Sequence, residues 1–155
     1  MTLNECMRKI ETDHFSQEAK GVDDVKEWEK RYMRTLPADL KEFYRRFYEV
    51  RLFSSSDSPY YILPITKVAP TNEVMYRTED PKLVSRYVFA LIFVWDGNYV
   101  AMDLRKKTGK PLYVDAFCET FHGAWKNPRI ITTSFTEFLS NALRSKGKHY
   151  WLGKK

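Results

Sequence analysis

Hydrophobic positions along the chain follow a helical period in its first third and an extended pattern afterwards. Apolar side chains recur every three or four residues in segments typical of amphipathic helices, namely 1–13, 23–32 and 37–50. After residue 59, aromatic and β-branched residues stand in short runs that favour strands. These runs cover 60–63, 86–94, 99–104, 111–116 and 130–133. Residues 14–21 and 117–129 have neither pattern, so we expect them to be loops.

Local signals mark several ends of these segments. Pro37 suits the first turn of the third helix, because that position needs no N–H donor. Asp96-Gly97 lies between two apolar runs, which predicts a β-hairpin. Ser134 with Glu137 fits a capping box, so a final helix begins there. This order predicts an α+β fold, with an antiparallel-dominated sheet of about four to six strands packed by N-terminal helices and a C-terminal helix.

Composition limits the class of protein. The 155 residues are 43% hydrophobic and 30% charged, a balance typical of a globular chain and not of a disordered one. We expect one domain over residues 1–155, with one sizeable core. The longest apolar run, Tyr87–Trp95, is far shorter than the roughly 20 residues needed to span a bilayer. Cys6 and Cys118 are too far apart for a disulfide framework, which fits a reducing, cytoplasmic location.

Charge is distributed unevenly along the chain. Residues 1–80 hold 13 basic and 15 acidic side chains, whereas residues 81–155 hold 13 basic and 5 acidic ones. An excess of one sign attracts partners of the opposite sign, although the same lysines can serve only to keep a surface solvated. Residues 145–155 form a basic tail that contains Tyr150 and Trp151. Such a tail is either a disordered end of the chain or part of an anion-binding surface.

Four stretches, taken in order, resemble features of the SUKH superfamily. They are 25–43, 61–65, 99–113 and 133–139. In the first stretch, Leu36-Pro37 separates two helices. In the third, Asp103 closes one strand and a turn with Gly109 precedes the next. The last stretch is similar to the superfamily's final strand-to-helix junction. Together they give a resemblance over residues 20–144.

The superfamily includes fungal cell-wall-assembly (glucan-synthesis) regulators and many bacterial toxin-immunity proteins. The resemblance implies a single SUKH-like domain that acts as a non-enzymatic protein-binding module. Bacterial members typically neutralise a toxin by binding it, and eukaryotic members act as adaptors. We therefore expect an immunity protein that occludes a cognate toxin, or a related regulatory adaptor. The superfamily shares no catalytic residues, so the resemblance assigns none to this chain.

Candidate partner-binding residues are aromatic and basic side chains near the predicted turns. Trp95 and Trp125 can act as interface anchors, because Trp buries a large area at low entropic cost, or they can simply cover the edge of the core. A basic hairpin tip carries the remaining candidates, Arg105, Lys106, Lys107 and Lys110. The alternative to a protein partner is nucleic acid, whose phosphates these cations and the tail could neutralise.

Two further groups of residues are compatible with chemistry. Cys118 and His122 have the spacing of one helix face, and Asp115 could add a third metal ligand. Asp96 and Asp103 flank a strand and could form an acid–base pair. A structural thiol, a surface histidine and aspartates in turns explain the same residues more simply. We expect no metal, no cofactor and no catalytic site, and rank an enzyme as the third hypothesis.

Overall fold

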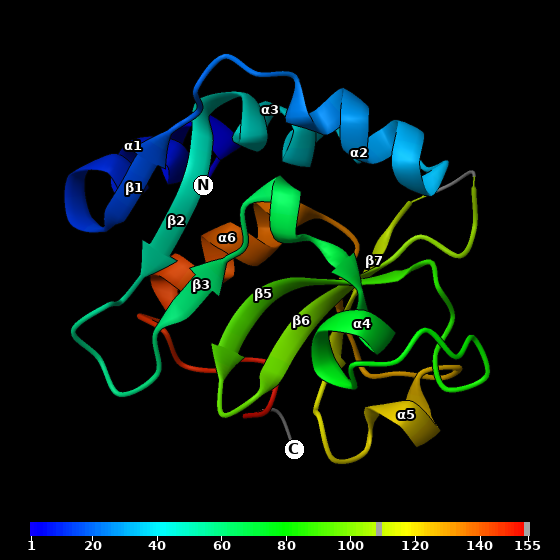
Figure 1. Cartoon of the computed structure of the whole chain (residues 1–155). Helices are drawn as coiled ribbons and strands as arrows, with labels where there is room; N and C mark the ends of the chain where they lie inside the picture. Colours follow the sequence, from blue (N-terminus) through cyan, green and yellow to red (C-terminus); the bar gives the residue numbers. More distant parts are fainter. Residues whose placement is uncertain (108–109, 154–155) are drawn as a thin grey trace.

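An eight-stranded sheet forms the centre of the fold. The computed structural model describes residues 1–107 and 110–153, and these form an α+β structure in which every strand pairing is antiparallel (Figure 1). The helices are α1 (Leu3–Asp13), α2 (Asp24–Tyr32), α3 (Ala38–Arg46), α4 (Thr71–Met75), α5 (Phe121–Ala124) and α6 (Phe135–Arg144), with a 3-10 turn η1 (Ile65–Lys67). The strands are β1 (Phe15–Glu18), β2 (Phe47–Leu52), β3 (Tyr60–Ile62), β4 (Ala69–Pro70), β5 (Val88–Trp95), β6 (Asn98–Asp103), β7 (Leu112–Ala116) and β8 (Ile130–Thr132). The predicted α+β class is confirmed, but the expected four to six strands are too few.

The sheet is a meander in which almost every strand pairs with the next along the chain. Its order is β1-β2-β3-β5-β6-β7-β8, and the short β4 pairs with β5 on the same side as β3. The predicted hairpin between β5 and β6 is confirmed. Its turn residues Asp96 and Gly97 have φ of 53° and 77°, as the favoured two-residue hairpin turn requires.

Helices α1, α3 and α6 cover one face of the sheet (Figure 1). Their apolar sides form the main core together with the inward residues of the strands. Phe43 on α3 packs edge-on against Phe135 on α6, with ring centroids 5.1 Å apart. The predicted start of α6 is confirmed, since the Ser134 hydroxyl accepts a hydrogen bond from the Glu137 backbone N–H at 3.2 Å.

The opposite face of the sheet is only partly covered. Helices α4 and α5 and the segment 76–87 pack over β5, β6 and β7 and bury a second, smaller cluster. The buried members of that cluster are Val84, Val88, Ala101, Val114, Ala116 and Phe121. Figure 1 shows no helix in front of β2 and β3 on this side. One end of the sheet is therefore a two-sided core, and the other presents an open face.

Two sequence-based expectations near β1 and β2 are wrong. Residues 14–21 were expected to be loop, but residues 15–18 form strand β1. The third helix was expected to reach Val50, but it ends at Arg46 and the chain continues directly as β2. A strand with buried Phe47, Val50 and Leu52 resembles the end of an amphipathic helix in its spacing. Pairing with β1 and β3 decides the outcome, and this pairing is not visible locally.

Most of the segment expected to form a basic tail lies against the main core. Trp151 is 8% exposed and stacks on the ring of His149 at 4.9 Å. The Tyr60 hydroxyl donates to the backbone oxygen of Lys148 at 3.1 Å. Lys154 and Lys155 lie outside the described residues. Within the residues that are described, none of the helices is long and apolar enough to pass through a bilayer.

Candidate functional site

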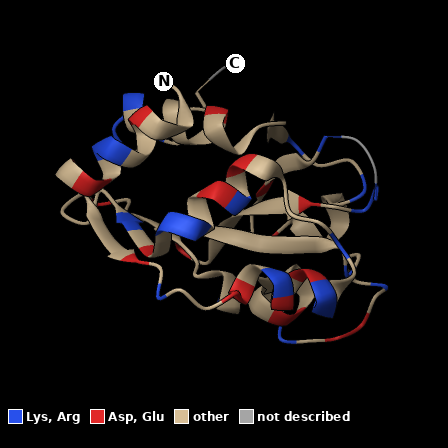
Figure 2. Cartoon of the chain, turned by 90° about the horizontal axis from the view of Figure 1, so that it is seen from above, with Lys and Arg blue, Asp and Glu red and all other residues tan. Residues whose placement is uncertain are grey.

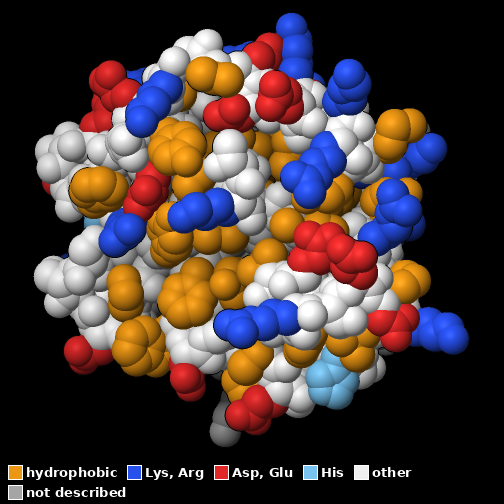
Figure 3. Space-filling view, viewed as in Figure 1, with side chains coloured by type: hydrophobic (Ala, Val, Ile, Leu, Met, Phe, Trp, Pro, Cys, Tyr) orange, Lys and Arg blue, Asp and Glu red, His pale blue; other side chains and the backbone are white. Residues whose placement is uncertain are grey.

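The open face of the sheet carries a row of aromatic side chains. Strand register aligns Phe15 with Arg51, Arg51 with Tyr61, Tyr61 with Phe93, and Phe93 with Tyr99. Directly paired residues of antiparallel strands point to the same face of a sheet. The five residues therefore form one line across β1, β2, β3, β5 and β6, which we call the aromatic row. Figure 3 shows hydrophobic side chains gathered over this part of the molecule, with charged groups between them.

Contacts along the aromatic row hold its side chains in place. The Arg51 guanidinium lies over the rings of Tyr61 and Phe15, at 5.0 and 5.8 Å from their centroids. Arg51 Nε also donates to Glu49 Oε1 at 2.8 Å. At the other end, Phe93 packs edge-on against Tyr99 at 5.4 Å. The row is thus a preformed surface, whose side chains would lose little freedom when a partner covers it.

Strand positions that point to an open sheet face normally carry polar side chains, because water solvates that face. Here Phe15 is 51% exposed, while Tyr61, Phe93 and Tyr99 are half-buried. Contiguous exposed aromatic surface of this kind marks an interaction site more often than a bare solvent face. Burial raises the pKa of the Tyr99 hydroxyl, so this phenol is neutral at neutral pH.

Trp95, a candidate from the sequence, lies at the turn end of the β5–β6 hairpin. Its side chain is 52% exposed, and an irregularity in the pairing between Phe93 and Trp95 precedes it. Its φ of 123° is unusual for a residue with a side chain. The turn is held to the segment that follows β7, because the Cys118 backbone N–H donates to Asn98 Oδ1 at 2.9 Å. Trp95 therefore projects from a fixed turn rather than from a loose loop.

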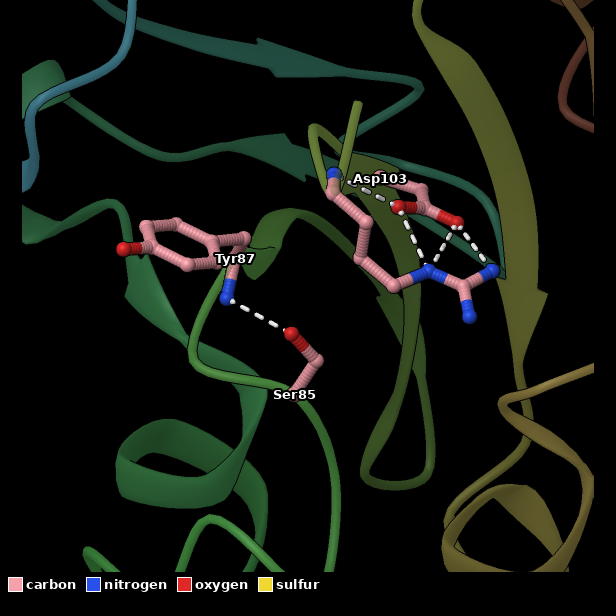
Figure 4. A network of polar contacts seen from close by, with 4 residues as sticks. Ser85, Tyr87 and Asp103 are labelled. Atoms are coloured by element: carbon pink, nitrogen blue, oxygen red, sulfur yellow. Dashed lines mark hydrogen bonds and ion pairs between the residues drawn. The ribbon is translucent and has the colours of Figure 1, made fainter. Parts of the chain in front are cut away.

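The basic candidates lie at the other end of β6. Arg105 holds the Asp103 carboxylate through its Nε and Nη2 atoms, at 3.0 and 2.8 Å (Figure 4). The Arg105 guanidinium also lies 5.3 Å from the Trp125 ring centroid, and Trp125 packs on the second cluster. Lys106, Lys107 and Lys110 are exposed, on the loop beside the grey trace in Figure 2.

The structure separates the predicted site residues into two groups. Trp95 pairs with the first residue of β6, whereas Arg105 is the second residue after the end of β6. A strand of this length is roughly 20 Å long, so the two groups cannot contact one small ligand together. The aromatic row was missed by sequence reasoning. Its signal was present in each strand, for example as exposed Arg51 between buried Val50 and Leu52, but only the register joins the strands.

The residues considered for chemistry have structural contacts. Asp96 occupies the hairpin turn, and Asp103 is paired with Arg105. The Tyr76 hydroxyl donates to the Cys118 backbone oxygen and accepts from the His122 backbone N–H, at 3.0 and 3.2 Å. Within residues 1–107 and 110–153, no group of three or more His, Cys, Asp or Glu side chains is arranged to hold a metal ion.

Comparisons with known proteins identify the family to which this fold belongs. One curated protein, immunity protein YokJ of Bacillus subtilis (strain 168), is 29% identical over 155 residues, an alignment that covers 98% of this chain and 90% of that protein. The model of the SMI1 / KNR4 family (SUKH-1) matches residues 22–141. That range extends from the loop before α2 to well inside α6, so it includes all but the first strand of the sheet. The chain therefore belongs to the SMI1 / KNR4 family (SUKH-1).

Proposed function

We propose that this chain is an immunity-type protein, which binds a protein toxin and neutralises it by covering a surface that the toxin needs. The similarity to an immunity protein over nearly the whole chain supports a protein partner. The observation that carries the proposal is the aromatic row on the open face of the sheet. Neutralisation by occlusion requires affinity and shape but no bond-making step, so we propose a role without catalysis.

The physical case for the row as an anchor is that it combines apolar area with rigidity. Aromatic and arginine side chains dominate the binding energy of many protein interfaces. Phe15 and Tyr61 are linked through Arg51, so one surface offers both apolar contact and a cation. Trp95, which is 52% exposed at the hairpin turn, would offer a separate aromatic contact. The remaining candidates on the basic loop would contact a more distant part of the partner.

Binding to a captured toxin tests this proposal. The tagged chain would first be used to isolate a stoichiometric protein partner from its own cells. That partner, expressed alone in a bacterial host, is expected to arrest growth, and co-expression of this chain should restore growth. Removal of two aromatic side chains by Phe15→Ser and Tyr61→Ser should weaken binding by about a hundredfold or more and abolish the rescue.

A matched control removes exposed apolar side chains outside the row. Val22→Ser with Leu152→Ser changes two exposed aliphatic residues and should leave both binding and rescue within about twofold of the unaltered chain. Circular dichroism and thermal melts would establish that both double variants fold. Equal loss in the two double variants, or a partner that has no effect on growth, would contradict the proposal.

A further inference from the structure

A basic hollow lies where β6 leads into the loop after Asp103. It has a volume of about 210 Å³, and its lining includes Arg34, Leu36, Leu104, Lys106, Lys107 and Pro111. None of the described residues that line it is acidic. Its lining combines the buried apolar residues Leu36 and Leu104 with cationic side chains. The hollow lies apart from the aromatic row.

Arg34 is a buried cation in the wall of this hollow. Its side chain is 8% exposed, and its Nε atom donates to the Leu104 backbone oxygen at 2.8 Å. Its Nη1 atom donates to the Met33 backbone oxygen at 3.0 Å. The guanidinium lies 3.5 Å from the centroid of the Tyr87 ring. Among the residues that the structure describes, no carboxylate forms an ion pair with Arg34.

An unpaired buried charge is unfavourable, and an anion from outside would relieve it. The acidic side chain at the end of β6 cannot do so, because Asp103 is already held by Arg105 (Figure 4). Lys106 and Lys107 are exposed and form no ion pair within the described part of the chain. The hollow therefore has a local excess of positive charge that the fold itself does not neutralise.

The surroundings of the hollow favour a carboxylate of a protein over a nucleic acid. Single-stranded nucleic acids bind through bases stacked on free aromatic faces. The Tyr87 ring already has Arg34 and Arg86 near it, and the Trp125 ring has Arg105 and Lys126 within 5.7 Å. The apolar lining residues Leu36 and Leu104 and the neighbouring Met33, which is 69% exposed, suit the mixed side chains of a protein segment.

We propose that the basic hollow receives an aspartate or glutamate side chain from an acidic loop of the partner protein. The carboxylate would bind the Arg34 guanidinium, and Lys106 and Lys107 would attract the surrounding acidic residues. This inference rests on the proposed function, because it assigns a second contact to the same protein partner. The two contacts would lie on different parts of the molecule, so they can be tested separately.

Fluorescence anisotropy at low salt tests the hollow with a labelled short poly-glutamate peptide and a thymidine oligonucleotide of matched charge. Lys106→Glu with Lys107→Glu should raise the Kd for the peptide by about tenfold or more. The control is Lys146→Glu with Lys148→Glu, which makes the same charge change at exposed lysines elsewhere and should alter the Kd by less than about threefold. Arg34→Lys keeps the charge but loses the planar fork, so it should also weaken binding.

Several outcomes would overturn the inference. They are equal weakening in both lysine double variants, tighter binding of the oligonucleotide than of the peptide, or no measurable binding of the peptide. The assay needs no toxin, so it remains informative if no partner neutralised by this chain is found and the proposed function fails. The converse outcome is a captured toxin that binds the Lys106→Glu, Lys107→Glu variant as tightly as the unaltered chain. That result would exclude the hollow as a contact with the partner and would not affect the proposed function.

Discussion

Two buried tyrosines show how the surroundings of a hydroxyl decide whether it stabilises or destabilises the folded protein. The Tyr44 hydroxyl donates to the backbone oxygen of Leu63 at 2.6 Å. The Tyr113 hydroxyl is equally enclosed, but it has no hydrogen-bond partner among the described residues. Burial raises the pKa of Tyr113 well above its ordinary value, so the group is neutral and simply desolvated. An unpaired polar group in a core costs free energy, whereas a paired one contributes.

Replacement of each hydroxyl by hydrogen should therefore give opposite results. Tyr44→Phe leaves the Leu63 oxygen without its donor and should lower the free energy of unfolding by about 1–2 kcal/mol. Tyr113→Phe should leave that free energy unchanged within about 0.5 kcal/mol, or raise it. Urea denaturation of both variants measures the difference. A larger loss in Tyr113→Phe than in Tyr44→Phe would contradict this account.

His14 links the end of α1 to the segment after β2 in one protonation state only. Its Nδ1 atom accepts a hydrogen bond from the Phe53 backbone N–H at 3.2 Å, so Nδ1 carries no proton. Burial, the largest cause, together with Lys9, lowers the pKa of His14 below its ordinary value of 6.5, while Asp13 opposes them. At pH values near 6.5, the unfolded chain binds more protons at His14 than the folded protein does. Stability present at neutral pH is therefore lost as the pH falls.

The expected result is a free energy of unfolding that decreases from pH 7 toward pH 5 by an amount that depends on His14. His14→Asn places an amide oxygen that can accept from the Phe53 N–H and cannot titrate. The pH dependence of this variant should be flatter over the same range. Denaturation curves recorded at several pH values would detect the change, and identical slopes would rule out His14 as the origin.

At the scale of elements, one carboxylate joins the two helices at the centre of the core. Asp39, in the first turn of α3, accepts from the backbone N–H and the hydroxyl of Thr136 at 2.9 and 3.0 Å. The Thr136 N–H belongs to the first turn of α6, where backbone donors have no partner within the helix. Asp39 thus caps a helix 97 positions away in the sequence. Ser134 supplies the local cap to the same turn.

Loss of this distant cap should be visible in stability. Asp39→Ala is expected to lower the free energy of unfolding by about 1–2 kcal/mol, because it leaves two donors of α6 without an acceptor. Glu42→Ala, an exposed change on the same helix, is the control and should cost less than about 0.5 kcal/mol. Similar costs in the two variants would show that the Asp39 contact contributes nothing in solution.

Elements defined by local signals were predicted well, and elements defined by distant partners were not. The caps and turn at Ser134 and Asp96-Gly97 depend on neighbouring residues, and the structure confirms the elements they predicted. Strand β1 has no such signal, since its residues 15–18 are held by pairing with β2, 29 to 36 positions later. The aromatic row could not be predicted for the same reason, because only the register of five strands brings its residues together. The place of Trp95 beside the hairpin turn was predictable because it is a local feature, while its role as a partner-binding residue stays a prediction.

At the scale of the whole molecule, residues 145–153 are part of the structure that covers the core. Trp151 packs beside Tyr60 and Phe138, with ring centroids at 6.4 and 6.0 Å. The lysines of residues 146–148 lie on the outside of the same segment. A positively charged stretch and a packed aromatic residue thus occupy a few consecutive positions, so composition alone gives no account of this segment.

Trp151→Ala measures this packing directly. Loss of the buried indole should lower the free energy of unfolding by about 3 kcal/mol or more. Leu152→Ala, which removes a neighbouring half-exposed side chain, should change it by less than about 0.5 kcal/mol. An unaffected Trp151→Ala variant would mean that the segment is a disordered tail in solution.

The meander order of the sheet sets the sequence in which the chain can fold during synthesis. From β1 to β8, nearly every strand finds its partner in the strand just made, so the sheet can grow hairpin by hairpin as the ribosome delivers it. Helix α1 emerges well before α6, on which it packs. Its apolar face, with Cys6, Met7 and Ile10, can contact α3 early, but its packing on α6 must wait until the intervening residues are translated. During that interval, the part of this face that α6 later covers is exposed to co-translational chaperones.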